Sequence, residues 1–243
     1  FYHAMLAGLA RRERIGRWSG WGWALGYAGG LACLLVALLG FVREDAWFGI
    51  AHEDAIHVRA TFLLVAGWYA LFSLPLFIWT PDEPSKSKPI AQAVRAGLRQ
   101  IAYTLRNVRR YRTIARFLVA RIFYMDGLTT IFNFGGVYAA GTFGMNAQQI
   151  LLFGITLNVT AGLGAFLFSW IDDWIGSRQT ILFSLLGIIL PGIGMLLTES
   201  TPFFWVMGAL LGIFVGPVQA ASRSYMSRLA PAEMRNEMFG LYT

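Results

Sequence analysis

Six long apolar blocks are the feature that most constrains how this chain can fold. Each is close to the roughly 20 helical residues that cross a hydrocarbon layer about 30 Å thick. They cover residues 19–41, 60–80, 115–140, 148–171, 180–197 and 202–222. Their residues are continuously apolar rather than alternating with polar ones, which favours helices over the strands of a barrel. We therefore predict an all-α integral membrane protein with six transmembrane helices in this chain.

The composition of the chain agrees with this fold class. Hydrophobic residues make up 56% of the sequence and charged residues only 14%, whereas a soluble domain averages about 25% charged residues. The net charge of +7 does not indicate a nucleic-acid partner, because in a membrane protein the placement of the basic residues is more informative than their sum. We expect the lipid bilayer, and no nucleic acid, as a partner.

The basic residues fall unevenly on the two sides of the membrane. Sixteen of the 20 lysines and arginines lie near the termini and in every second loop, whereas the opposite loops hold only Arg43 and Arg59. The positive-inside rule assigns the basic side to the cytoplasm. We predict a multi-pass protein of the bacterial inner membrane with the ends of this chain in the cytoplasm. A vacuolar membrane is the alternative.

A linker divides the chain into two membrane units. Residues 81–112 begin with prolines and serines and continue as a basic stretch with helical periodicity, which predicts a cytoplasmic linker with a basic amphipathic helix. We assign residues 1–80 to the end of an N-terminal bundle, as spans five and six of twelve. Residues 113–243 then form the C-terminal bundle, with spans seven to ten and the start of span eleven.

An internal repeat supports the number of twelve spans. Shifting the sequence by 220 residues aligns Leu9, Ala10, Glu13 and Gly20 with identical residues. Both copies lie in predicted cytoplasmic loops, and six spans separate them. A repeat unit of six spans predicts two pseudo-symmetric six-helix bundles, of which this chain is a fragment.

The loop at residues 169–178 resembles a cytoplasmic loop signature of the major facilitator superfamily. Asp173, Gly176 and Arg178 match that signature, whereas Ser169 and Trp174 depart from it. The stretches 13–20, 26–30, 138–145 and 216–224 resemble the vacuole-effluxer-like branch of the superfamily, which includes autophagy-related amino-acid effluxers. The resemblance implies a major facilitator fold and transport of small metabolites, with amino acids as the cargo of fungal members.

Motifs for other kinds of chemistry were not found in the sequence. It contains neither a phosphate-binding Gly-Lys-Ser loop nor a His-Glu-x-x-His motif, so we predict no enzyme activity, no cofactor and no metal site. We predict a secondary active transporter that moves a small polar metabolite, such as an amino acid, by alternating access with protons as the coupling ion. The alternative is a transport-inactive membrane sensor or assembly partner with the same fold.

The third apolar block carries the best candidates for a transport pathway. A charged side chain inside a span costs several kcal/mol unless it is paired or faces water. Asp126, Thr130 and Asn133 share one helical face, with Asp126 as a protonatable or cation-binding group. Alternatively, Asp126 pairs with Arg121 or another helix and only stabilises the bundle. The predicted pathway residues are Asp126, Arg121, Asn133, Thr130, Tyr124, Asn158 and Gln219.

Two further sets of residues are predicted to support movement. The first is a cytoplasmic gate in which Asp173 caps the following helix and Arg178 pairs with Glu233 or Glu237 in one conformation. Its members are Asp173, Gly176, Arg178 and Glu233. The second set is two stripes of glycines that allow close helix packing. They are Gly22, Gly26 and Gly30, and Gly208, Gly212 and Gly216.

Overall fold

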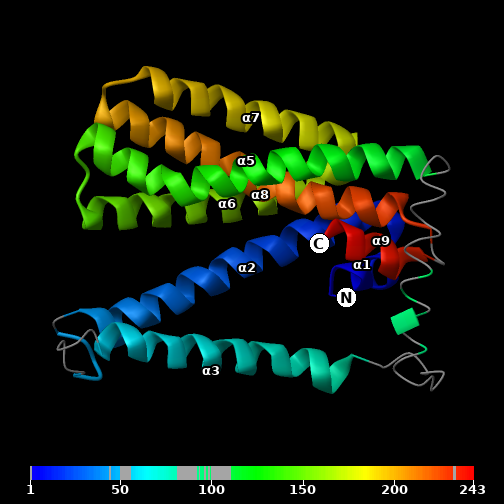
Figure 1. The fold of residues 1–243 in the computed structure, drawn as a ribbon, viewed down its shortest axis with the longest axis horizontal. Coiled ribbons are helices and arrows are strands. Elements are labelled where there is room, and N and C mark those ends of the chain that lie inside the picture. The colour runs from blue at the N-terminus through cyan, green and yellow to red at the C-terminus, as the bar shows by residue number, and fades with distance from the viewer. Residues whose placement is uncertain are drawn as a thin grey trace. The chain divides into compact units, whose positions relative to one another are not determined.

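The computed structural model describes residues 2–43, 45–49, 56–80, 111–231 and 234–243, together with residues 92, 94, 95, 97 and 99. Within these ranges the chain forms helices and no strands (Figure 1), which confirms the predicted fold class. Of the amphipathic helix predicted in the linker, only these five residues are described, and they are helical; the rest lies outside the described residues. The elements are α1 (Tyr2–Leu9), η1 (Arg12–Arg14), α2 (Ile15–Ala37), the π-helical η2 (Leu38–Val42), α3 (Ile56–Trp79), α5 (Arg112–Phe143), α6 (Ala147–Ile175), α7 (Ser177–Leu197), α8 (Thr201–Leu229) and α9 (Arg235–Tyr242).

The helix boundaries follow from local chemistry. α6 begins at a capping box, in which Asn146 and Gln149 accept each other's backbone N–H groups. α5 ends at Gly144, whose φ of 62° lies in the left-handed region that glycine adopts without strain. Most helices extend beyond the predicted apolar blocks. Hydropathy marks the part of a helix inside the hydrocarbon, whereas the helix itself continues into the polar interface.

In the described part of the chain, five helical segments are long and apolar enough to cross a membrane: Arg12–Phe41, Arg59–Trp79, Gln149–Ile175, Ser177–Leu197 and Thr201–Leu229. The remaining predicted block, 115–140, does form a helix, the 32-residue α5. This helix is less apolar than the other five segments, because Arg116, Arg121, Asp126 and Asn133 interrupt its apolar surface.

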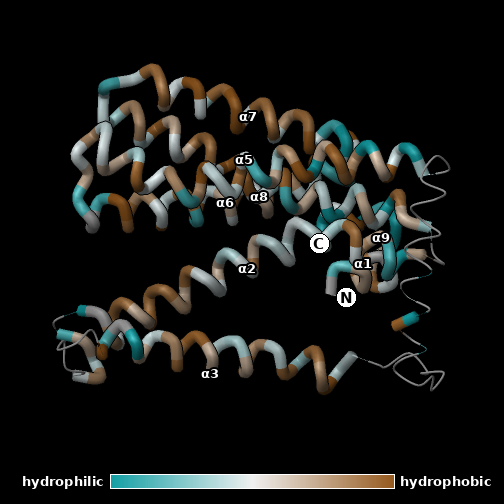
Figure 2. Tube along the Cα trace, viewed as in Figure 1, coloured by the Kyte–Doolittle hydropathy of each residue, from teal (hydrophilic) through white to brown (hydrophobic). Residues whose placement is uncertain are grey.

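Residues 1–28 and 101–243 form one compact unit. Within it α6 and α7 both pack along α8, α5 contacts α6 and α8, and α1 and α9 pack together near the end of α8 (Figure 1). The core is centred on α8, where Phe204, Val215 and Val218 are fully buried. Hydrophilic residues gather at the end of this unit where α5 begins and α8 ends (Figure 2).

Residues 29–100 form a second compact unit. It contains the last part of α2, then η2 and α3, and α3 contacts η2. The rings of Phe41 and Phe48 lie 4.9 Å apart at the turn that follows η2. The predicted boundary between two six-helix bundles, at the linker, stays a prediction.

Candidate functional site where α2 meets α6 and α8

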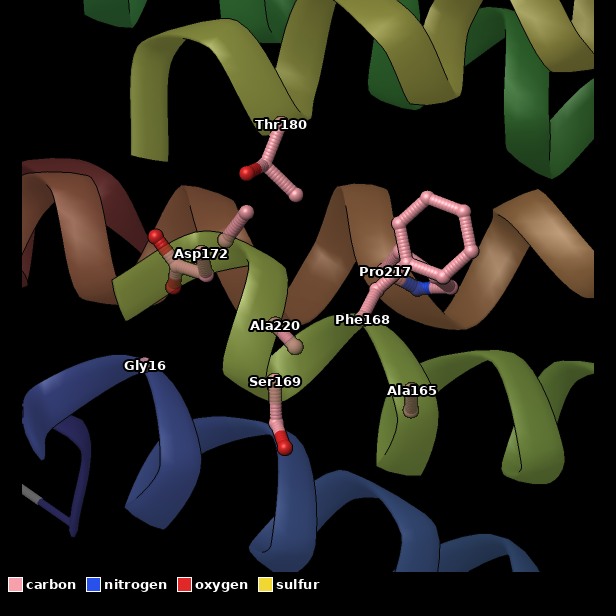
Figure 3. A pocket seen from close by; sticks show the side chains of 9 residues that line it. Gly16, Ala165, Phe168, Ser169, Asp172, Thr180, Pro217 and Ala220 are labelled. Carbon is pink, nitrogen blue, oxygen red and sulfur yellow. The ribbon is translucent and has the colours of Figure 1, made fainter. Parts of the chain in front are cut away.

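The first turns of α2 lie directly against the last turns of α6. A Cβ atom added at Gly16 would come within 2.7 Å of an Asp173 oxygen, and one added at Gly20 within 2.5 Å of the Cβ of Ser169. Figure 3 shows Gly16, Ser169 and Asp172 around the narrow cavity at this contact, which leaves no room for a water molecule. Only glycine permits so close a backbone approach at these two positions.

Asp173 of α6 caps the N-terminus of α2. Its carboxylate accepts the backbone N–H groups of Gly16, at 2.8 Å, and of Arg17, at 3.2 Å. The Arg17 side chain lies 3.3 Å from the second carboxylate oxygen. The first N–H groups of a helix have no acceptor inside the helix, and the helix dipole favours a negative charge there. Asp173 therefore stabilises α2 in its position against α6.

Arg228, in the last turn of α8, joins this cluster from the opposite side. Its guanidinium donates to Asp173 at 2.9 Å, to Asp172 at 3.1 Å and to the Ser177 hydroxyl at 2.6 Å. The side chains of Asp172 and Asp173 are only 3% and 5% exposed. The positive charge of Arg228 thus stabilises the two carboxylates in a nearly water-free environment. An unpaired carboxylate would be costly to bury there.

A second arginine of α8 reaches α2 one turn deeper. Arg223 is 5% exposed, and its guanidinium donates to the Ser19 hydroxyl at 2.9 Å and to the Ser19 carbonyl at 2.6 Å. The same hydroxyl donates to the Ala220 carbonyl at 2.7 Å. Ser19 is fully buried, so this contact links α2 to α8 through polar groups that are all hydrogen-bonded. We call Gly16, Arg17, Ser19, Asp172, Asp173, Arg223 and Arg228 the α2 contact site.

The structure rearranges the predicted gate. Asp173 caps α2 rather than the following helix α7, whose N-cap Gly176 gives no side-chain cap. The basic partners of Asp173 are Arg17 and Arg228, while Arg178 is exposed. Glu233 lies outside the described residues.

Sequence reasoning missed Arg17, Asp172, Arg223 and Arg228, although one signal was available. The last predicted apolar block ended at residue 222, so Arg223 and Arg228 were counted as loop residues. Yet α8 continues to Leu229. The signal is their position within two helical turns of the end of the block, where a helix can continue into the interface.

The polar face of α5 is open. Asp126, Thr130 and Asn133 are all exposed, and none of them has a hydrogen bond or ion pair with a residue in the described ranges. In particular, Asp126 does not pair with Arg121 there. The three side chains therefore form a polar stripe along a helix that is otherwise largely apolar.

Four other predicted pathway residues are engaged within the bundle. Arg121 lies 3.7 Å over the ring of Tyr242 and donates to the carbonyl of the same residue. Tyr124 shares a 2.6 Å hydrogen bond with Ser222.

Asn158 and Gln219 are the other two. Asn158 donates to the carbonyl of Gly154 in its own helix at 2.8 Å, so its amide group is used locally. Gln219 is half-buried in α8, and its side chain lies near the Tyr27 hydroxyl of α2.

The two glycine stripes have different surroundings. Gly208, Gly212 and Gly216 face α6, where added Cβ atoms would collide with Phe153, Thr160 and the Ala161 carbonyl. In α2, a Cβ at Gly22 would lie 3.1 Å from Arg223, whereas no described atom lies within 4 Å of such positions at Gly26 and Gly30. The glycines that bring α2 close to α6 are therefore Gly16 and Gly20.

Comparison with known proteins places the chain in a family. The profile of the "Vacuole effluxer Atg22 like" family matches residues 8–243. The chain belongs to this family, as the sequence motifs predicted.

Curated relatives carry names of the same kind. The "Uncharacterized MFS-type transporter YxiO" of Bacillus subtilis (strain 168) is 25% identical over 248 residues, an alignment that covers 100% of this chain and 56% of that protein. "Autophagy-related protein 22" of Coccidioides immitis is 22% identical over 216 residues, with 79% of this chain and 36% of that protein covered. The chain thus spans about half the length, or less, of these relatives. No solved structure matches it significantly.

Proposed function

We propose that this chain is part of a secondary active transporter in which the α2 contact site closes the cytoplasmic side of the transport pathway. The observation that carries the proposal is the capping of α2 by Asp173 together with the buried pairing of Arg223 and Ser19. On the predicted domain division, α2 belongs to the N-terminal bundle and α6 and α8 to the C-terminal bundle. The site would then be a contact between two bundles that rock against each other.

The chemistry of the site suits a contact that forms and breaks. An apolar interface at this position would expose hydrophobic surface to water when it opens. By contrast, the carboxylates and guanidinium groups of the site regain hydration when water enters, which offsets much of the lost pairing. Such an interface can open and close with a small net change in free energy, as alternating access requires.

The exposed polar stripe of α5 supports the pathway part of the proposal. A carboxylate in a span is tolerated where it lines a water-filled cavity, and Asp126 has no partner among the described residues. Asp126 would bind the coupling proton or a cation, and Asn133 and Thr130 would hydrogen-bond a polar substrate. A small polar metabolite, such as an amino acid, fits this set of groups.

The comparisons support a transporter, and the family description supports efflux as the direction. The family description names a vacuole effluxer, and the Bacillus relative is named as an MFS-type transporter. We propose that the protein acts in a bacterial inner membrane, with the α2 contact site at the cytoplasmic face, because the arginines of residues 11–17, of α5 and of α8 gather at that end.

Counterflow in proteoliposomes tests the proposal. The full-length protein is reconstituted with pooled amino acids inside, and the uptake of each labelled amino acid is measured with and without an imposed proton gradient. Accumulation of one pool member that responds to the gradient would support a proton-coupled transporter. Silence across amino acids and other small metabolites, from protein shown to be folded, would instead favour a transport-inactive sensor or assembly partner.

A further inference from the structure

A groove of about 490 Å³ lies between the starts of α5 and α7, beside the end of α8. It is separate from the α2 contact site and shares no residue with it. Arg116 of α5, Arg178 of α7 and Tyr225 of α8 are among the residues that line it. Its volume falls in the range of about 300–1,000 Å³ that small-ligand sites occupy.

The charged and the apolar lining residues lie at different depths along the helices. Arg178 is the second residue of α7, and Ile181, Leu182 and Leu185 follow it at steps of three and four, on one helical face. Arg116 is the fifth residue of α5. At 1.5 Å of rise per residue, both arginines lie within about 8 Å of their helix starts. The groove therefore has a cationic entrance and an apolar interior.

The charge of this entrance is not compensated within the described part of the chain. Neither Arg116 nor Arg178 forms a hydrogen bond or ion pair with a described residue, and no acidic residue lines the groove. Arg17 and Arg228 differ in this respect, because both are paired with carboxylates. Two free guanidinium groups on neighbouring helices match an anion with several oxygens, such as a phosphate.

We propose that this groove binds an anionic phospholipid. The headgroup phosphate lies between the guanidinium groups of Arg116 and Arg178, and an acyl chain runs along Ile181, Leu182 and Leu185. A soluble phosphate would use only the arginines, whereas a lipid also covers the apolar interior, where Leu182 is 49% exposed. Basic sites between helices at the cytoplasmic interface suit anionic headgroups in this way. The position follows from the predicted orientation, which places this end at the inner leaflet.

The experiment uses full-length protein in nanodiscs of phosphatidylethanolamine with a small fraction of photoreactive phosphatidylglycerol. After illumination, the cross-linked peptides are mapped and the cross-linking yield is measured for three proteins. These are the wild type, the groove variant R116Q/R178Q and the control variant R12Q/R14Q. Arg12 and Arg14 lie in η1, are exposed, and are absent from the groove, so the control removes the same charge elsewhere. The melting temperature shows that each variant is folded.

The proposal predicts cross-links in peptides covering residues 113–124 and 178–185. It also predicts a yield that falls roughly tenfold or more in R116Q/R178Q and changes less than twofold in R12Q/R14Q. Excess inorganic phosphate should leave the yield unchanged. The proposal is overturned by an equal yield in both variants, or by cross-links confined to other segments. Displacement of the lipid by inorganic phosphate would show a free-anion site instead and would also overturn it.

Discussion

Asp173 of α6 accepts the backbone N–H of Gly16 in α2 at 2.8 Å, across 157 residues of sequence. The relationship depends on both residues at once. A side chain at position 16 would occupy the space of the Asp173 carboxylate, and without that carboxylate the first turn of α2 would lose a cap. The α2 contact site therefore depends on backbone geometry as well as on charge.

Removing the Asp173 carboxylate should weaken this contact strongly. We expect D173A to lower the apparent melting temperature of the full-length protein by roughly 5–10 °C, because α2 would lose its cap and the partly buried Arg228 would lose one of its two carboxylate partners. D173N should have a smaller effect, since an amide oxygen can still accept the N–H of Gly16. Fluorescence-detected size-exclusion after heating measures this shift. The control E199Q changes an exposed carboxyl group and should melt like the wild type, and a D173A protein that also does so would refute the capping role.

Exchanging the charges should fail to restore the site. If Asp173 and Arg228 formed only an ion pair, the double variant D173R/R228D would recover the stability lost in D173A. An arginine at position 173 cannot accept the backbone N–H groups of Gly16 and Arg17. We therefore expect the stability of the double variant to stay within about 1 kcal/mol of that of the less stable single variant, D173R or R228D. The melting temperature of the double variant tests this expectation. Full recovery of the wild-type melting temperature would show that the contact is a simple charge pair.

Glycine substitutions in α2 should separate contact positions from free ones. In G20A the new methyl group would meet Ser169 and the Ala165 carbonyl at 2.5 Å, and such overpacking costs about 1–3 kcal/mol. In G26A no described atom lies within 4 Å of the new methyl group, so stability should stay the same or rise slightly, since alanine favours a helix. Thermal melting of the two variants side by side measures the difference. A G26A protein less stable than G20A would contradict the packing described.

The Ser19 hydroxyl should matter because it is buried together with Arg223. We expect S19A to cost about 1–3 kcal/mol, because the guanidinium Nε then loses the acceptor at 2.9 Å and the Ala220 carbonyl loses a donor. S73A is the matched control, since Ser73 is half-buried and its hydroxyl, among the described residues, donates to the Ala70 carbonyl of its own helix. The two melting temperatures give the comparison, and equal effects would mean that the Ser19 link to α8 contributes nothing.

The helices could be predicted from the sequence because the surrounding lipid determines which segments must be helical. A run of about 20 apolar residues has few alternatives in lipid, so the blocks of α2, α3, α6, α7 and α8 were found. The ends of the helices could not be read in the same way. α8 passes Arg223 and Arg228 without interruption, since a helix tolerates charges once its side chains find partners or reach the interface.

The partners within the site could not be predicted because they lie far apart in the sequence. The loop motif pointed to Asp173, but nothing local shows that its carboxylate meets the start of α2 rather than the start of α7. The stripe formed by Gly22, Gly26 and Gly30 illustrates the same limit. Helical spacing places three small residues on one face, yet a different pair, Gly16 and Gly20, faces α6.

Cross-linking α2 to α6 tests most directly whether this contact must open during transport. The double variant G20C/S169C, in a C33S background, places two cysteines where the Cβ positions lie 2.5 Å apart. A small outward shift therefore reaches the 3.5–4.5 Å of a disulfide. Counterflow of the pooled amino acids is measured in proteoliposomes before and after oxidation, and again after reduction. The account predicts that oxidation abolishes counterflow and that reduction restores it, whereas undiminished counterflow in the fully oxidised protein would contradict it.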